Sequence, residues 1–155
     1  MTVLVTTGTT PFEGLIKSID GLDNPEWTFK YQIALGSKYL PSSDSYFFFS
    51  DKIEQLYISS DIVVCHAGAG TVFKLLEMKK MAVVVPNSER RDKHQLDLAN
   101  YVDTNDYAIV CYDVKNIGDA ILKARDFRPK VYIKEEFFKD NFLNKIIADE
   151  YGFDR

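Results

Sequence analysis

The chain has 155 residues, of which 46% are apolar and 27% are charged, and its formal net charge is −4. This composition is typical of a globular protein, the length suits one domain rather than two, and the negative charge argues against general nucleic-acid binding. No apolar stretch approaches the ~20 residues that span a bilayer, and the start MTVLVTTGTT lacks the pattern of a signal peptide, so a cytoplasmic protein is expected.

Short apolar runs alternate with segments of helical periodicity along the chain. Strands are predicted at residues 3–5, 29–35, 46–49, 62–65, 82–85 and 107–111. Helices are predicted at residues 11–19, 53–57, 69–78, 91–102, 114–124 and 134–150. Several strands are continuously apolar, as expected when both faces of a sheet are covered. The predicted fold is therefore α/β, a single domain over residues 1–155 with a Rossmann-like parallel sheet and helices on both faces.

Three polar loops follow strands at one edge of the predicted sheet. They cover residues 7–11, 66–71 and 87–95. In open parallel sheets, ligands bind beyond the carboxyl ends of the strands. The convergence of these loops therefore predicts a ligand site at that edge.

The second loop, the run HAGAGT at residues 66–71, joins a strand directly to a helix. A helix that begins near Ala69 leaves its first N–H groups without helical partners and carries partial positive charge. Glycines allow a phosphate to approach such a backbone closely. The alternative is a tight turn in which the glycines serve packing alone.

The other two loops also have structural alternatives. The run TTGTTP at residues 6–11 offers hydroxyls and N–H groups to a phosphate, or is an N-cap followed by proline at the first helical position. The charged third loop is of a kind that is usually just solvated. However, His94 and Gln95 stand at a helix start and offer donors and acceptors that suit sugar hydroxyls.

Taken in order, the motifs resemble the nucleotide-sugar half of the GT-B glycosyltransferases. They are DIVVC followed by HAGAGT (residues 61–71), VVVP (83–86) and DKHQLDLA (92–99). The opening VTTGTTPF (5–12) and the aromatic run FFF (47–49) are similar to a split subgroup, in which the donor-binding half is a separate small protein. That subgroup includes bacterial capsule and exopolysaccharide transferase subunits, and the eukaryotic subunit that adds the second N-acetylglucosamine to a dolichol-linked precursor. The resemblance covers about residues 2–125.

The resemblance implies a UDP-sugar donor and a role for each loop. The diphosphate is expected at the glycine turn, the uracil near the third strand and its following loop, and the transferred sugar at the third loop. Related transferases bind the ribose through a glutamate at the position of Lys74, so Glu77 becomes the candidate here. The implied site residues are His66 as a catalytic group; Gly8, Thr9, Thr10, Gly68, Ala69, Gly70 and Thr71 for the phosphates; Glu77 for the ribose; and His94 and Gln95 for the sugar.

The implied reaction inverts the anomeric centre, with an acceptor hydroxyl attacking C1 as UDP leaves. Fixed N–H groups and the helix N-terminus stabilise the charge on the leaving diphosphate, so neither a metal nor a cofactor is expected. The general base tends to come from the acceptor half of full-length enzymes. Glu13 is the local candidate, and its alternative is a first-turn glutamate favoured by the helix dipole.

The absent acceptor half implies a partner. The expected function is the catalytic, donor-binding subunit of a hexosyltransferase that acts on a lipid-linked saccharide in capsule or exopolysaccharide assembly. A membrane-anchored acceptor-binding subunit would hold it at the cytoplasmic face of the membrane. The apolar stripe of the helix predicted at 134–150 packs on the chain's own sheet or docks on that partner, and self-association is left open. The alternative function is a non-catalytic or regulatory nucleotide-binding subunit of the same fold.

Overall fold

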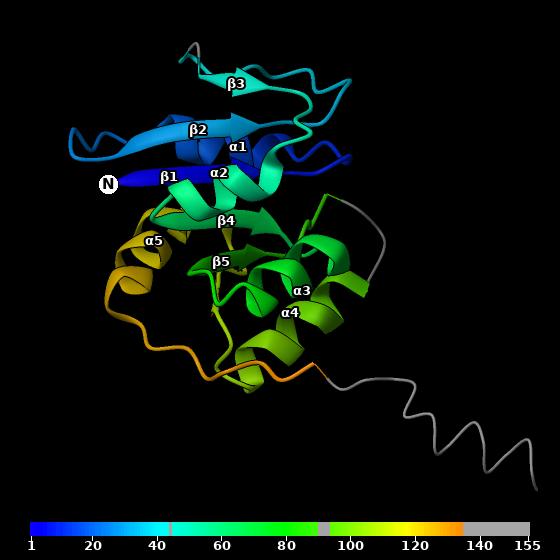
Figure 1. The fold of residues 1–155 in the computed structure, drawn as a ribbon. Coiled ribbons are helices and arrows are strands. Elements are labelled where there is room, and N and C mark those ends of the chain that lie inside the picture. Colours follow the sequence, from blue (N-terminus) through cyan, green and yellow to red (C-terminus); the bar gives the residue numbers. More distant parts are fainter. Residues whose placement is uncertain (44, 90–93, 135–155) are drawn as a thin grey trace, which may run out of the picture.

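The computed structural model describes residues 1–43, 45–89 and 94–134. In these ranges six strands form one parallel sheet with helices on both faces (Figure 1), as predicted. The strands are β1 (Thr2–Thr6), β2 (Thr28–Gln32), β3 (Tyr46–Phe47), β4 (Ile62–His66), β5 (Ala82–Val85) and β6 (Ile109–Val110). The helices are α1 (Glu13–Asp20), α2 (Ile53–Ser59), α3 (Ala69–Glu77), α4 (His94–Thr104) and α5 (Ile117–Asp126), with the 3-10 turn η1 (Val114–Asn116) before α5.

The two faces of the sheet bury separate apolar clusters. Helices α1 and α5 cover one face, and α2, α3 and α4 cover the other (Figure 1). Alternate residues of β1 divide between them, since Val3 and Val5 join the first cluster and Leu4 joins the second. Every residue of β4 and β5 is buried, which is why these strands read as continuous apolar runs. Each buried valine or isoleucine of these strands stabilises the fold by roughly 1.5–3 kcal/mol.

The strand order reverses at the centre of the sheet. The order is β3-β2-β1-β4-β5-β6, and β1 pairs in parallel with both β2 and β4. The chain therefore builds outward on one side of β1 and then on the other. In doubly wound sheets the ligand crevice lies where this reversal occurs, beyond the carboxyl ends of the central strands. The loops after β1 and β4 flank that position.

Several predicted elements differ in length from the observed ones. The second strand, predicted at 29–35, ends at Gln32, and the chain turns at Gly36, whose φ is +91°. The third, predicted at 46–49, is limited to β3, and beyond it the Phe48 carbonyl accepts from the Gln32 side chain. The sixth strand is likewise shorter. The first helix begins at Glu13 rather than at Pro11, and α4 runs on to Thr104.

The chain after α5 runs back along the helices of the second face. The ring of Tyr132 lies 5.6 Å from that of Phe73 and 5.5 Å from that of Tyr107, measured between centroids. Only residue 134 of the helix predicted at 134–150 lies within the described residues, so the docking role of that helix stays a prediction. Over the described ranges, no helix combines the length and hydropathy needed to cross a bilayer.

Candidate functional site

His66, the last residue of β4, is packed between the first two loops. Its exposed fraction is 8%. A Cβ atom added at Gly8 would lie 2.9 Å from His66 Cε1, and one added at Gly68 would lie 2.4 Å from His66 Nε2. Gly8 also has a φ of +59°, which side-chain-bearing residues rarely adopt. Both glycines are therefore required for the imidazole to sit where it does.

The amino end of α3 opens onto the same place. Gly68 is the N-cap, its backbone is extended, and it provides no side-chain cap. The first helical hydrogen bond runs from Val72 N to Gly68 O at 2.9 Å. The amides of the residues between them therefore have no carbonyl partner within the helix. A Cβ added at Gly70 would meet no described atom within 4 Å. Such an open, positively polarised helix end is a common anion site.

Thr71 contributes to the contact between α2 and α3. Its side chain forms a hydrogen bond with the hydroxyl of Tyr57, a buried residue of α2. Burial raises the pKa of Tyr57, while this hydrogen bond acts in the opposite direction. Part of the hydrogen-bonding capacity of Thr71 is thus used inside the protein, and its contact with a phosphate stays a prediction.

The loop after β1 is held from below by a buried glutamine. Gly8 N donates to Gln32 Oε1 at 3.0 Å, and Gly8 O accepts from Gln32 Nε2 at 2.9 Å. The N–H of Gly8 is therefore already hydrogen-bonded within the protein, and its contact with a phosphate stays a prediction. Thr9 is exposed and Thr10 half-buried, and Thr10 N donates to Thr7 O at 3.2 Å. Their contacts with a ligand stay predictions.

The third loop is tied to the first by another buried amide. Asn87 is 3% exposed, and its Nδ2 donates to Pro11 O at 3.1 Å. Asn87 N donates to Gln95 Oε1 at 3.0 Å, so the nitrogen of the Gln95 amide is the end that can reach a ligand. His94 is the first residue of α4 and is exposed. The predicted convergence of the three loops is confirmed by these contacts, and residues 90–93 lie outside the described ranges.

Two predicted acidic residues are engaged elsewhere. The carboxylate of Glu13 accepts from Lys38 N and Tyr39 N, each at 2.7 Å, so it anchors the loop after β2. Glu77 is the last residue of α3, about 12 Å along the helix from Ala69 at 1.5 Å per residue. Its Oε1 lies 2.8 Å from Lys134 Nζ. That end of α3 lies away from the three loops, at the opposite edge of the sheet, and the ribose role of Glu77 stays a prediction.

The structure identifies two further candidate site residues, neither of which was assigned a role from the sequence. Phe49, in the loop after β3, is 83% exposed. Glu54, in the first turn of α2, has its Oε1 2.8 Å from Lys74 Nζ, with side chains 58% and 39% exposed. The sequence placed the uracil near the third strand and its following loop without choosing a residue, and no spacing in the sequence predicts the contact between α2 and α3.

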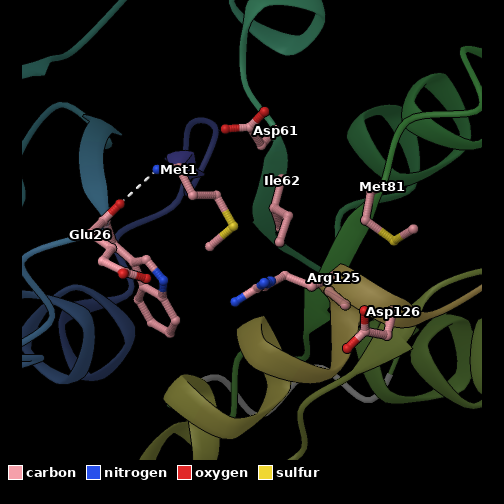
Figure 2. Close-up of a pocket in the computed structure, with 9 residues that line it drawn as sticks. Met1, Glu26, Asp61, Ile62, Met81, Arg125 and Asp126 are labelled. Carbon is pink, nitrogen blue, oxygen red and sulfur yellow. Dashed lines mark hydrogen bonds between the residues drawn. The ribbon is translucent and has the colours of Figure 1, made fainter.

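A pocket of about 530 Å³ lies at the amino edge of the sheet, away from the three loops. Figure 2 shows Arg125 of α5 reaching into it beneath Met1 and Ile62. The acidic residues Glu26, Asp61 and Asp126 also line it, which disfavours a diphosphate there. In the described part of the chain, no group of three or more His, Cys, Asp or Glu side chains is placed to hold a metal ion.

The comparison that decides the family covers nearly the whole chain. The sequence description of the Glycosyltransferase family 28 C-terminal domain matches residues 2–149. The chain belongs to this family. It is a glycosyltransferase-family half-domain, and the glycine turn at the amino end of α3 lies inside the matched region.

Named relatives of this family-28 domain are N-acetylglucosamine transferases. The UDP-N-acetylglucosamine transferase subunit ALG13 of Yarrowia lipolytica is 31% identical over 171 residues, which cover 99% of this chain and 86% of that protein. The ALG13 subunit of Homo sapiens is 31% identical over 123 residues, covering 70% of this chain and 11% of that protein. The UDP-N-acetylglucosamine--N-acetylmuramyl-(pentapeptide) pyrophosphoryl-undecaprenol N-acetylglucosamine transferase of Clostridium perfringens is 29% identical over 119 residues. These residues cover 74% of this chain and 30% of that protein.

Solved structures agree on the fold. MurG of Acinetobacter baumannii superposes with a TM-score of 0.61 at 18% identity, over 80% of this chain and 42% of that one. The solution structure of ALG13 superposes with a TM-score of 0.55 at 16% identity, over 96% of this chain and 95% of that one. The prediction of a single GT-B half-domain is confirmed.

Proposed function

We propose that the chain is the donor-binding subunit of an inverting transferase that moves N-acetylglucosamine from UDP-N-acetylglucosamine to a lipid-linked acceptor. The observation that carries this is the open amino end of α3 beside His66, at the centre of the sheet's carboxyl edge. The relatives support the choice of donor, because their names specify UDP-N-acetylglucosamine. The name of the Clostridium perfringens relative includes a pyrophosphoryl-undecaprenol acceptor, which supports a lipid-linked one here.

In this proposal the diphosphate lies against the first amides of α3. As the bond to the sugar breaks, negative charge grows on the leaving phosphate. The amides of Ala69 and Gly70 and the helix dipole are already directed at that position, so they stabilise the charge without rearrangement. His66, held between the two glycines, donates a further hydrogen bond from the end of β4. Together these groups stabilise the negative charge of the leaving diphosphate, as a bound cation would.

The base and ribose of the donor extend toward β3 and α2. The ring of Phe49 offers an exposed aromatic face on which a uracil can stack. The ribose then lies between Phe49 and the amino end of α3, where Glu54 stands in the first turn of α2. A carboxylate accepts hydrogen bonds from both hydroxyls of a ribose. The Oε1 of Glu54 also lies 2.8 Å from Lys74 Nζ, in an exposed ion pair on which the ribose contact does not depend.

In this proposal His94 and the amide nitrogen of Gln95, on this chain, contact the transferred sugar. The acceptor is bound by a partner. Because both oxygens of Glu13 hold a loop, we assign the general base to the partner rather than to Glu13. That partner is membrane-anchored and keeps the chain at the cytoplasmic face of the membrane. The relatives named above give no support for capsule or exopolysaccharide assembly in particular.

Calorimetric titration of the purified chain with UDP, with ADP as the control, tests the donor site. We expect UDP to bind and ADP to bind more weakly, because the proposed donor carries uracil. Equal affinity for both nucleotides would remove the uracil assignment. If UDP binds neither to the chain nor to the chain co-purified with its partner subunit, the donor role is wrong.

The Glu54→Gln variant tests the ribose contact. Loss of a charged hydrogen-bond acceptor costs about 1.5–3 kcal/mol, so the Kd for UDP should rise about tenfold or more. The Kd for 2′-deoxy-UDP should change much less, because one of the two hydroxyls is already missing. The matched control is Lys74→Met, which breaks the same ion pair but keeps the carboxylate, and should affect both ligands little. Equal losses of UDP affinity in the two variants would show that Glu54 forms only a surface ion pair and does not bind the ribose.

A further inference from the structure

Gln32, the last residue of β2, is a buried amide beneath the site, with an exposed fraction of 6%. Its oxygen accepts from Gly8 N at 3.0 Å and from the Thr6 hydroxyl. Its nitrogen donates to Gly8 O and to Phe48 O, each at 2.9 Å. A carboxamide has two N–H donors and one acceptor oxygen. The shortest hydrogen bonds of this side chain therefore use both its nitrogen and its oxygen, and all of them go to protein groups at the sheet edge.

These contacts join two different walls of the site. Gly8 belongs to the loop after β1, directly against His66. Phe48 precedes the exposed Phe49 in the loop after β3. A buried amide is tolerated only when its hydrogen bonds are satisfied, so a movement of either loop would leave a polar atom unpaired. One side chain therefore holds the two loops at a set separation.

We propose that Gln32 is a positioning residue. It sets the spacing between the loop after β1, which packs against His66 beside the proposed diphosphate, and the loop after β3, which carries Phe49 at the proposed uracil position. This spacing tunes the site to a nucleoside diphosphate. This inference rests on the proposed function, because UDP is the ligand that would touch both walls. Inorganic pyrophosphate would contact only α3 and His66, so its affinity does not depend on the spacing between the two loops. Gln32 touches no ligand and acts through the backbone of Gly8 and Phe48.

The test is the Gln32→Met variant of the full chain, titrated with UDP and with inorganic pyrophosphate. Methionine has a similar length and no hydrogen-bonding amide, so the strand keeps its volume while the two loops separate. We expect the Kd for UDP to rise about tenfold or more, and the Kd for pyrophosphate to change by less than about threefold. Losses by the same factor for both ligands, or an unchanged Kd for UDP in a folded variant, would overturn the proposal.

A control and a second variant separate positioning from general destabilisation. Val3→Ala removes buried volume from β1, away from the loops, and should lower the unfolding temperature without changing the ratio of the two affinities. If Gln32→Met does not fold, Gln32→Glu is used. It keeps an acceptor for Gly8 N but cannot donate to Phe48 O when ionised, so the same fall in selectivity for UDP is expected.

Hydrogen exchange on the unliganded chain gives a readout that does not depend on nucleotide binding. We expect Gln32→Met to speed exchange in residues 7–10 and 48–50 together, while Val3→Ala speeds neither. Faster exchange in only one of the two segments would show that Gln32 does not couple them, which overturns the proposal. A wild-type chain that fails to bind UDP while both segments respond would count against the proposed function and leave the coupling in place.

Discussion

Replacing Gly70 by valine should abolish UDP binding and transfer and leave the fold intact. Gly70 is the second residue of α3, it is exposed, and a Cβ there meets no described atom within 4 Å. Valine is also a better helix former than glycine, by about a few tenths of a kcal/mol. The added methyl groups therefore crowd only the space in which the diphosphate is proposed to lie. We expect kcat/KM to fall by about a hundredfold or more, the scale of losing amide stabilisation of a leaving group.

The measurement pairs donor kinetics with thermal unfolding. Gly70→Ala is the matched control, because a single methyl group at the same position should weaken UDP binding far less than valine does. Both variants should unfold at or above the temperature of the wild type. A Gly70→Val chain that keeps normal transfer with its partner would place the diphosphate elsewhere.

Replacing Gly68 by alanine should be damaging, for a reason internal to the protein. The new Cβ would lie 2.4 Å from His66 Nε2, so the imidazole must leave its place between the glycines. Overpacking of this kind costs about 1–3 kcal/mol, which lowers the unfolding temperature of a domain of this size by several degrees. Transfer should fall by about a hundredfold, because the displaced imidazole no longer reaches the leaving phosphate. Gly70→Ala, the same change two residues later, has open space and should show neither effect.

A double variant distinguishes the chemistry of His66 from its packing. His66→Asn shortens the side chain that clashes with the new methyl group. In combination with Gly68→Ala it should recover the unfolding temperature of the single His66→Asn variant, yet remain as poor in transfer as that variant. Recovery of transfer together with stability would show that His66 only fills the gap between Gly8 and Gly68.

Local patterns in the sequence determined the architecture and the location of the candidate site. The continuous apolar runs of β4 and β5 predicted strands covered on both faces, because such a strand has no side that water can reach. The run HAGAGT placed a helix start directly after a strand, and α3 begins at Ala69, as expected. These features depend on neighbours in sequence, which is why periodicity and turn composition are sufficient to find them.

Only the tertiary structure decided which polar groups remain available to a ligand. Glu13 has the residue type of a base, but both of its oxygens hold the loop after β2. Glu77 is the last residue of α3, at the far end of that helix from the glycine turn. The roles proposed for Gln32 and Glu54 depend on contacts across the fold, with Gly8, Phe48 and Lys74. The physical reason is that each polar group has a limited hydrogen-bonding capacity. The sequence shows which groups can donate or accept, and the packing of distant elements determines which of them are already engaged.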